Sequence, residues 1–379
     1  MEKYIPRKIS TAIEKAAKFY QVIVVTGPRQ VGKTTLCKRL FNDYKYFNFE
    51  DVSLREIVES DTKGFLDKCG DKVIIDEVQR APNLLSYIQL AVDENPDKQY
   101  ILTGSSNFSL LENITQSLAG RAALFTLLQF SMDELSEYSK SATTNDLLFQ
   151  GLYPAPIVKG FPASQFYRNY YSTYIERDVR QIINIKNIDA FQTFIRLCAG
   201  RTGTEFNASS IATEVGMSAP TIKEWLTILQ TSYIIFKLQP YYANINKRLV
   251  KTPKIYFYDT GILCFLLGIE SPEQLSTHPL RGSIFENLAV VELLKHRYND
   301  DKTNNLYYYR ENSGKEVDIL QTEGNDLHLY EVKSSMTYNS DFKKNLIYLN
   351  SLFGNKIKSS TVVYDGTGFP PDIINIRDI

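Results

Sequence analysis

The segment Gly27–Thr34 (GPRQVGKT) constrains the fold of this chain more than any other part of it. It fits the pattern GxxxxGK[ST], follows the apolar run Gln21–Thr26 and opens the helical pattern Lys33–Phe41. A glycine-rich turn between a strand and a helix surrounds a phosphate with backbone N–H groups, and the helix N-terminus adds positive potential. The sequence therefore predicts a phosphate-binding loop. The residues expected to bind the nucleotide are Gly27, Pro28, Arg29, Gln30, Val31, Gly32, Lys33, Thr34 and Thr35.

A second motif, Lys72–Glu77 (KVIIDE), indicates the chemistry of this loop. The motif is typical of an apolar strand that ends in two acids. We expect Lys33 to reach the β- and γ-phosphates of ATP and the Thr34 hydroxyl to bind Mg²⁺. Asp76 stands where a carboxylate supports the magnesium ion, and Glu77 is placed to activate the attacking water as a general base. Together the two motifs predict an ATP-hydrolysing enzyme.

Short apolar runs alternate with helical patterns between residues 20 and 130, which predicts a parallel sheet covered by helices on both faces. The expected strands are Gln21–Thr26, Lys45–Phe49, Lys72–Val78, Gln99–Thr103 and Ala122–Leu128, and the helical patterns include Lys33–Phe41, Leu84–Val92 and Phe108–Leu118. One further strand lies between the two motifs, which fits NTPases that use a glutamate after the aspartate rather than GTPases. We therefore expect an α/β fold with an N-terminal P-loop NTPase of the AAA+ type.

Two further residues are candidates for catalytic roles. The segment Ile101–Ser106 ends a strand in hydroxyl groups, and we expect Ser105 to act as a sensor of the γ-phosphate or the water; the alternative is an ordinary turn of small residues. Arg121 precedes the last strand, which is the place of the arginine finger that a neighbouring subunit supplies in AAA+ order. A surface arginine at this position is the alternative, and Arg177 and Arg180 are rival fingers. A finger supplied in trans would require a homo-oligomer.

The overall charge gives no support for a nucleic-acid partner. The chain has 43 Lys and Arg residues and 43 Asp and Glu residues, so any basic surface must be local. The four cysteines form no CxxC pair, as expected of reduced thiols in a cytosolic protein. The N-terminus lacks the apolar segment of a signal peptide, and the longest apolar stretch, Ile262–Ile269, is shorter than the roughly 20 residues that span a bilayer. We expect a cytoplasmic protein with no membrane partner.

A helix-turn-helix followed by a β-hairpin is predicted between residues 204 and 258. The helical patterns cover Ala208–Val215 and Ala219–Gln230, and the strand patterns cover Tyr233–Leu238 and Lys254–Tyr258. Ser218 is a good N-cap for the second helix, and this order of elements favours a winged helix. The second helix carries only Lys223 as a basic residue, which is a poor footprint for DNA, whereas the segment between the strands is basic. DNA contact and a packing module both fit this pattern.

The C-terminal hundred residues follow the order α-β-β-β-α-β. The expected elements are the helix Ser283–His296, the strands Leu306–Arg310, Glu316–Leu320 and Leu327–Lys333, the helix Asp341–Leu352 and the strand Ser360–Tyr364. Adjacent strands can bring Asp318 and Glu331 together to hold Mg²⁺ or Mn²⁺. Lys333 points to the same side as Glu331 and would activate a water for attack on a phosphodiester. Glu286 on the leading helix could add a metal ligand. The alternative is a nuclease-like fold that does not cut.

On these residues the chain resembles a prokaryotic AAA+ ATPase family whose members carry a C-terminal domain of unknown function. The resemblance rests on Gly27–Thr35, Val73–Gln79 (VIIDEVQ), Leu102–Ser106 (LTGSS), Glu176–Arg180 (ERDVR), Tyr258–Gly261 (YDTG), Gly314–Asp318 and Glu331–Lys333. It implies an AAA+ domain over residues 1–135, a helical lid or linker over 136–205, a winged helix-turn-helix over 206–275 and a restriction-endonuclease-like PD-(D/E)xK domain over 276–379. The catalytic roles that it implies fall on Lys33, Thr34, Asp76, Glu77, Asp318, Glu331 and Lys333.

Two functions follow from the sequence. The first is an ATP-driven machine that acts on nucleic acid, with a metal-dependent nuclease as its effector. The second is a nucleotide-dependent switch or scaffold, in which ATP binding drives assembly and the nuclease-like domain binds a partner without cutting.

Overall fold

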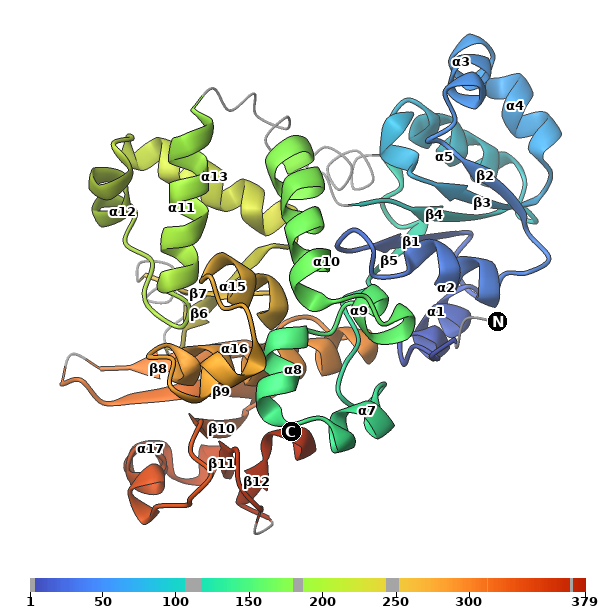
Figure 1. Ribbon diagram of the computed structural model, residues 1–379. Coiled ribbons are helices and arrows are strands. Elements are labelled where there is room, and N and C mark those ends of the chain that lie inside the picture. Colours follow the sequence, from blue (N-terminus) through green and yellow to red (C-terminus); the bar gives the residue numbers. More distant parts are fainter. Residues whose placement is uncertain (1–3, 106–116, 180–186, 243–251, 312, 369–370) are drawn as a thin grey trace.

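The computed structural model describes residues 4–105, 117–179, 187–242, 252–311, 313–368 and 371–379, with the backbone alone for residues 176–179. The rival finger candidates Arg177 and Arg180, most of the expected helix Phe108–Leu118 and the basic segment 243–251 therefore lie outside the described side chains. Figure 1 shows the parallel sheet of the N-terminal region on one side of the molecule, a helical region beside it and the C-terminal strands at the opposite end.

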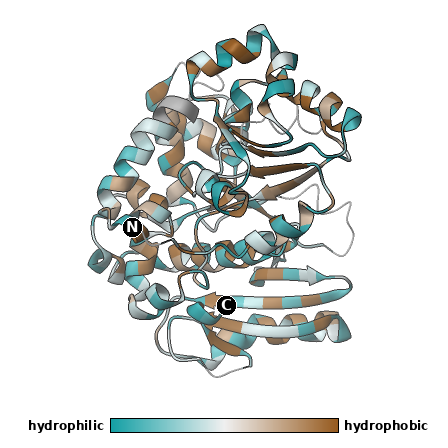
Figure 2. Ribbon diagram, turned by 90° about the vertical axis from the view of Figure 1, so that its right-hand side faces the viewer, coloured by the Kyte–Doolittle hydropathy of each residue, from teal (hydrophilic) through white to brown (hydrophobic). Residues whose placement is uncertain are grey.

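A parallel five-stranded sheet forms the N-terminal region, in the order β2-β3-β4-β1-β5. Its strands are β1 (Val22–Thr26), β2 (Lys45–Asn48), β3 (Lys72–Asp76), β4 (Gln99–Thr103) and β5 (Ala122–Thr126). Strand β1 consists of β-branched residues that are all buried, as a parallel strand covered on both faces requires. The strands in the upper half of Figure 2 are accordingly coloured hydrophobic along much of their length. The predicted parallel α/β sheet is confirmed, and each strand lies within its predicted run.

Successive residues of β1 point to opposite faces of this sheet, so two cores meet there. Val22 and Val24 pack in a core with helix α5, whereas Ile23 and Val25 belong to a core that continues through α2 into the rest of the molecule. The helices of this region are α1 (Ser10–Ala16), α2 (Lys33–Leu40), α3 (Val52–Ser60), α4 (Thr62–Cys69), η1 (Val78–Arg80) and α5 (Leu84–Glu94). The continuous core makes the N-terminal sheet one packing unit with the regions that follow.

A helical region follows β5 and is held together by aromatic side chains and one buried acid. Its elements are α7 (Ser136–Ser141), α8 (Thr144–Gln150), α9 (Pro154–Lys159), α10 (Ala163–Tyr170), the π-helical η2 (Tyr171–Val179) and α11 (Ile188–Gly200). The ring of Tyr153 packs on those of Phe166 and Tyr170. Asp259 accepts hydrogen bonds from the Tyr167 hydroxyl at 2.7 Å and the Leu152 backbone N–H at 2.8 Å. This aspartate, from the YDTG segment, therefore fixes the loop between α8 and α9.

Two helices joined by a tight turn follow α11, as the sequence predicts. They are α12 (Ala208–Val215) and α13 (Ala219–Thr231), and the antiparallel strands β6 (Ile235–Pro240) and β7 (Lys254–Phe257) come next. Gly216 takes the left-handed conformation at φ 72°, and the Ser218 hydroxyl caps α13 by accepting from the Thr221 N–H at 3.2 Å. The winged helix stays a prediction, because β6 also pairs with a C-terminal strand, Gln239 lying opposite Tyr307.

The C-terminal strands extend this hairpin into a mixed sheet in the order β12-β11-β10-β9-β8-β6-β7. The further strands are β8 (Leu306–Arg310), β9 (Glu316–Glu323), β10 (Asp326–Lys333), β11 (Ile357–Tyr364) and β12 (Ile373–Asn375). The helices are α15 (Thr260–Leu266), η3 (Pro272–Ser276), α16 (Arg281–Asn299), η4 (Ser340–Lys343), α17 (Lys344–Phe353), η5 (Gly354–Lys356) and η6 (Ile376–Asp378). The element order matches the prediction except for β12, which is too short to leave a sequence pattern. A restriction-endonuclease-like fold stays a prediction.

Helix α16 ties the C-terminal region to the loop after β5. The Lys295 ammonium donates to the Phe130 carbonyl oxygen at 2.8 Å and pairs with Glu292 at 2.6 Å. The other Glu292 oxygen accepts from the Met132 N–H at 2.7 Å. The Lys295 and Glu292 side chains are both buried, so these contacts are screened little by solvent.

Within the described residues, no helix combines the length and the apolar character needed to cross a bilayer.

Candidate functional site

The loop from Gly27 to Gly32 is shaped by backbone conformations that a side chain would oppose. Gly27 has φ 139°, and a Cβ atom there would collide with the Leu127 carbonyl oxygen. Gly32 has φ 94° and stands immediately before α2, whose first backbone N–H groups therefore face the loop. Gln30 also has a positive φ, 62°. These backbone conformations are compatible with the phosphate-binding loop that the sequence predicts.

Lys33 is buried beneath this loop. Its ammonium donates to the Gly27 carbonyl oxygen at 3.0 Å and to the Pro28 carbonyl oxygen at 2.7 Å. Burial lowers the pKa of Lys33 to about 8, although the carboxylates of Glu77 and Asp76 act in the opposite direction. The phosphates of a nucleotide would supply the negative charge that restores its usual pKa.

Asp76 ends β3 with its carboxylate among three hydroxyl groups. The Thr34 and Tyr46 hydroxyls each donate to Oδ2 at 2.8 Å, and the Thr103 hydroxyl donates to Oδ1. Thr34 and Asp76 are the two residues predicted to serve the magnesium ion, and the fold brings them into direct contact. A hydroxyl and a carboxylate side by side are the oxygen donors that Mg²⁺ prefers, so these residues fit the ion.

Glu77 follows Asp76 in the left-handed conformation, φ 57°, which turns its side chain away from the strand. Gln79 donates to Glu77 Oε2 and, at 3.2 Å, to the Ser105 hydroxyl. Ser105 in turn donates to Glu77 Oε2 at 3.5 Å. The predicted base and the predicted sensor therefore lie together, with Gln79 between them.

Sequence reasoning missed Tyr46, Thr103 and Gln79. The strand register explains the second, because Asp76 on β3 lies one step beyond the pair Ile75–Leu102, and Thr103 is its neighbour on β4. Gln79 lies within the motif VIIDEVQ, and the polar side-chain amide at this position was the sequence feature that could have identified it.

A cavity of about 620 Å³ opens at the loop. Its lining includes the P-loop residues Arg29, Gln30, Val31, Gly32, Lys33, Thr34 and Thr35, together with Glu77. Gly27 and Pro28 are not in the lining, and their carbonyl oxygens accept hydrogen bonds from the Lys33 ammonium. The lining also includes the apolar residues Phe130, Pro154 and Val158, of which the last two belong to α9, so the helical region forms part of the site. Basic side chains, among them Arg7 and Lys159, line it as well.

Arg121 lies at the other end of the sheet from the chain's own P-loop, because it precedes β5 whereas Gly27 follows the parallel strand β1. Its guanidinium makes two contacts with Asp93, at 2.6 and 2.8 Å, on the surface. The fold does not bring Arg121 to Lys33 or Glu77 of the same chain.

The C-terminal candidates Asp318, Glu331 and Lys333 come together at the ends of β9 and β10. The Lys333 ammonium lies 2.7 Å from Glu331 Oε1 and 3.6 Å from Asp318 Oδ2. Asp318 also accepts from the Val332 N–H at 2.7 Å. Burial, with the charge of Asp318, raises the pKa of Glu331 to about 8.

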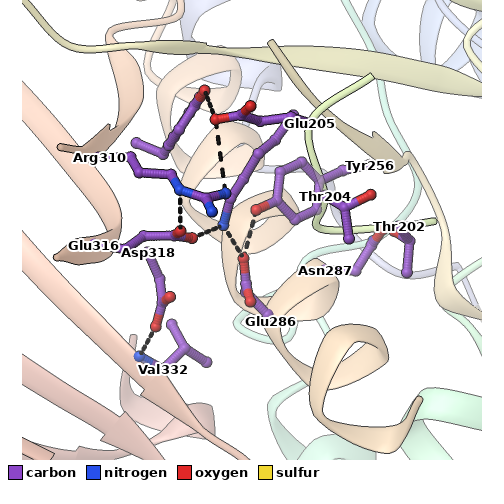
Figure 3. A network of polar contacts seen from close by, with 12 residues as sticks. Thr202, Thr204, Glu205, Tyr256, Glu286, Asn287, Arg310, Glu316, Asp318 and Val332 are labelled. Atoms are coloured by element: carbon purple, nitrogen blue, oxygen red, sulfur yellow. Dashed lines mark hydrogen bonds and ion pairs between the residues drawn. The ribbon is translucent and has the colours of Figure 1, made fainter. Parts of the chain in front are cut away.

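Glu286 on α16 is engaged elsewhere. It accepts from the Tyr256 hydroxyl at 2.5 Å and pairs with Lys254 at 3.2 Å. Figure 3 shows Tyr256 and Glu286 pointing toward one another. Lys254 also pairs with Glu316 at 2.5 Å and has almost no exposed surface. In the described part of the chain, no three Asp, Glu, His or Cys side chains form a group that could hold a metal ion. The expected set Glu286, Asp318 and Glu331 is therefore not assembled, and Glu286 pairs with Lys254 instead.

Three family models match successive parts of the chain. Residues 20–136 match a family described as an AAA domain, residues 141–273 match a domain of unknown function (DUF8612), and residues 281–376 match a domain of unknown function (DUF4143). These matches support an AAA-type P-loop ATPase with a C-terminal domain of unknown function.

Two curated relatives extend over most of the chain. An uncharacterized protein of Mycobacterium tuberculosis is 28% identical over 335 residues, which cover 87% of this chain and 74% of the relative. An uncharacterized protein of Haemophilus influenzae is 20% identical over 362 residues, 86% of each chain.

Two solved structures resemble parts of the chain at low identity. The Walker-type ATPase of Pyrococcus abyssi has a TM-score of 0.44 and 15% identity, over 68% of this chain and 94% of that chain. The RuvB Holliday junction branch migration motor of Thermotoga maritima has a TM-score of 0.31 and 15% identity, over 61% and 87%.

Proposed function

We propose that this chain binds and hydrolyses ATP at the loop of residues 27–35. The observation that carries the proposal is the 2.8 Å hydrogen bond from the Thr34 hydroxyl to Asp76, with Glu77 next in the chain. This contact joins the phosphate-binding loop to the strand that holds both acids, so one site contains a phosphate cradle and a candidate base. The match of residues 20–136 to an AAA domain supports the same activity.

Each residue has a separate task in this proposal. Lys33 binds the β- and γ-phosphate oxygens, and Thr34 with Asp76 would hold Mg²⁺. When bound, Mg²⁺ neutralises the charge that develops on the phosphate oxygens. Glu77 orients the attacking water and accepts its proton, while Ser105 is within reach of the same water. The apolar side chains of the cavity lining, Phe130, Pro154 and Val158, receive the base of the nucleotide.

Nucleotide binding tests the first half of this proposal. A fluorescent ATP analogue is titrated into the wild type, Lys33→Ala and the control Lys68→Ala, which removes an exposed ammonium on α4. We expect Lys33→Ala to weaken binding by about tenfold or more, since it removes charge-assisted hydrogen bonds to phosphate. Equal affinity in all three proteins would contradict the proposal.

A second candidate function is metal-dependent cleavage of DNA by the C-terminal region. The observation that favours it is the approach of the Lys333 ammonium to Glu331 and Asp318, at 2.7 and 3.6 Å. One Glu331 oxygen is buried without a hydrogen-bond partner among the described residues, which leaves it available to a cation. In this proposal Asp318 and Glu331 hold Mg²⁺ or Mn²⁺, and Lys333 orients the attacking water.

Cleavage of plasmid and single-stranded DNA tests this candidate. The assay contains Mg²⁺ or Mn²⁺, with and without ATP, and compares the wild type with Lys333→Ala and with the exposed control Lys358→Ala. Cutting that is lost only in Lys333→Ala supports a nuclease, and dependence on ATP would link the two sites. Absence of cutting under every condition contradicts it.

The alternative to cleavage is a nucleotide-dependent switch whose C-terminal region binds a partner. The observation that favours it is Lys254, which satisfies Glu286 and Glu316 and so turns part of the acidic cluster into an ion-pair network. An ATP-dependent change of oligomeric mass, unaffected by Glu331→Ala, would support this alternative. A mass that does not respond to nucleotide would count against it.

A further inference from the structure

The P-loop strand contacts the end of the helix-turn-helix through Tyr233. The Tyr233 hydroxyl lies 3.2 Å from Thr26 Oγ1 and 3.5 Å from Thr126 Oγ1. Thr26 donates its own proton to the Phe125 carbonyl oxygen at 3.3 Å, so Tyr233 is the donor to Thr26. Thr26 is the last residue of β1, and Gly27 begins the P-loop directly after it. A shift of the loop that moves Thr26 would therefore change its hydrogen bond with the Tyr233 hydroxyl.

A second tyrosine joins the loop to the same helix end. The Arg29 guanidinium lies 5.1 Å from the centroid of the Tyr174 ring, in cation–π geometry. The Tyr174 hydroxyl donates to the Ser232 carbonyl oxygen at 3.1 Å. Ser232 is the C-cap of α13, and Tyr233 is the next residue. The contact from Thr26 and the contact from Arg29 through Tyr174 thus reach two adjacent residues, Tyr233 and Ser232.

The backbone of Tyr233 has a positive φ, which is uncommon for an aromatic residue. At φ 54° it closes α13 with hydrogen bonds from the Tyr233 N–H to Gln230 and from the Ile234 N–H to Leu229, at 3.0 and 2.8 Å. This is a Schellman end, which normally uses glycine.

Helix α15 provides the comparison within the same chain. It closes with the same pair of hydrogen bonds, but through Gly268 at φ 73°. A tyrosine at a position where glycine is favoured points to a role for its side chain, and here its hydroxyl reaches the P-loop strand.

We infer that Tyr233 and Tyr174 couple nucleotide occupancy of the P-loop to the position of α13. The inference rests on the proposed ATP binding. Phosphate oxygens compete with the Gly27 and Pro28 carbonyl oxygens for the Lys33 ammonium, so binding rearranges the loop between Thr26 and Arg29. Those two residues are the ones that the tyrosines contact. Reciprocity of linkage requires that a partner bound to α13 change the affinity for ATP by the same factor.

Hydrogen–deuterium exchange tests the coupling in the full chain. The exchange of residues 219–240 is measured with and without a non-hydrolysable ATP analogue in the wild type, Tyr233→Phe and Tyr174→Phe. The control is Tyr100→Phe, which removes a buried hydroxyl that has no hydrogen-bond partner among the described residues. We expect the analogue to change this exchange about fivefold or more in the wild type and the control. The change is expected to fall below about twofold in Tyr233→Phe and to shrink in Tyr174→Phe.

The outcomes separate the inference from the proposed function. A wild type that binds the analogue without any change at residues 219–240 overturns the coupling alone. So does a Tyr233→Phe variant that responds like the wild type. A wild type that fails to bind the analogue overturns the proposed function, and the coupling with it. A merely structural role of Tyr233 would lower thermal stability but leave the response to the analogue intact.

Discussion

The buried Lys254 on β7 and the partly exposed Glu316 on β9 form an ion pair of 2.5 Å that joins the hairpin after the helix-turn-helix to the C-terminal strands. The same ammonium reaches Glu286 on α16 at 3.2 Å. Burial opposes the charge on Lys254, but the carboxylates of Glu286, Asp318 and Glu316 outweigh it, so the pKa of Lys254 lies above its usual value. Lys254 therefore stays charged and balances a cluster of acids that would otherwise repel one another.

Removal of this charge is expected to destabilise the protein. Lys254→Met keeps the length of the side chain but leaves Glu286 without its counter-ion and Glu316 with Arg310 alone, at 3.5 Å. A buried charge that loses its partner costs about 3–5 kcal/mol. Urea denaturation should show this loss in the free energy of unfolding. The control Lys302→Met breaks an exposed pair with Asp300 and should change stability by less than about 1 kcal/mol. Equal stability of Lys254→Met and the wild type would mean that the network is not a structural link.

The pH dependence of stability is expected to report on Asp259. Burial raises the pKa of this carboxyl in the folded chain, although hydrogen bonds from Leu152 and Tyr167 act against it. The folded state therefore holds the proton more tightly than the unfolded state does. The contribution of Asp259 to the free energy of unfolding falls as the pH rises from about 4, its unfolded pKa, through the folded pKa.

Asp259→Asn removes this titration and isolates its contribution. The difference in free energy of unfolding between the wild type and the variant should move in favour of the variant as the pH rises from about 4. The control is Asp97→Asn, which makes the same substitution at an exposed aspartate. The slope is the readout, because the amide changes the hydrogen bonds at every pH. A difference that is constant with pH would contradict the raised pKa.

The sequence could place the candidate phosphate site at the ends of β1 and β3 because each part of it is contiguous. The loop before Lys33 and the acids Asp76 and Glu77 each follow a strand that could be read from apolar runs alone. Partners from other strands could not be read in this way, since they depend on register. Tyr46 and Thr103 contact Asp76 only because β2 and β4 lie on either side of β3.

The C-terminal cluster illustrates the same limit. Asp318 and Lys333 lie on paired strands, and their approach was predictable from alternation and adjacency. Lys254 comes from the hairpin, more than sixty residues earlier than Asp318, and no sequence pattern links it to Glu286. The pairing of β6 with β8 brings Lys254 beside Glu286. Glu286 therefore pairs with Lys254 and does not form the expected group with the other carboxylates.

Mixing of variants tests whether Arg121 acts as a finger on a neighbouring subunit. Arg121→Ala should lower ATP turnover by about 10³-fold if it stabilises the transition state in trans. Mixing Arg121→Ala with Glu77→Gln should restore part of the turnover, because one subunit supplies the base and the other supplies the arginine. Asp93→Asn, which removes the partner of Arg121, serves as the control and should retain turnover. Full ATP turnover in Arg121→Ala would show that Arg121 is not an arginine finger.

Single-turnover hydrolysis by Glu77→Gln tests the central claim most directly. The amide keeps the shape of the side chain but cannot accept the proton of the attacking water. The account predicts that the variant binds ATP like the wild type and releases phosphate about 10²–10⁴-fold more slowly, so that ATP stays trapped on the protein. Phosphate release at the wild-type rate in Glu77→Gln would contradict the assignment of the base, and with it the proposed mechanism.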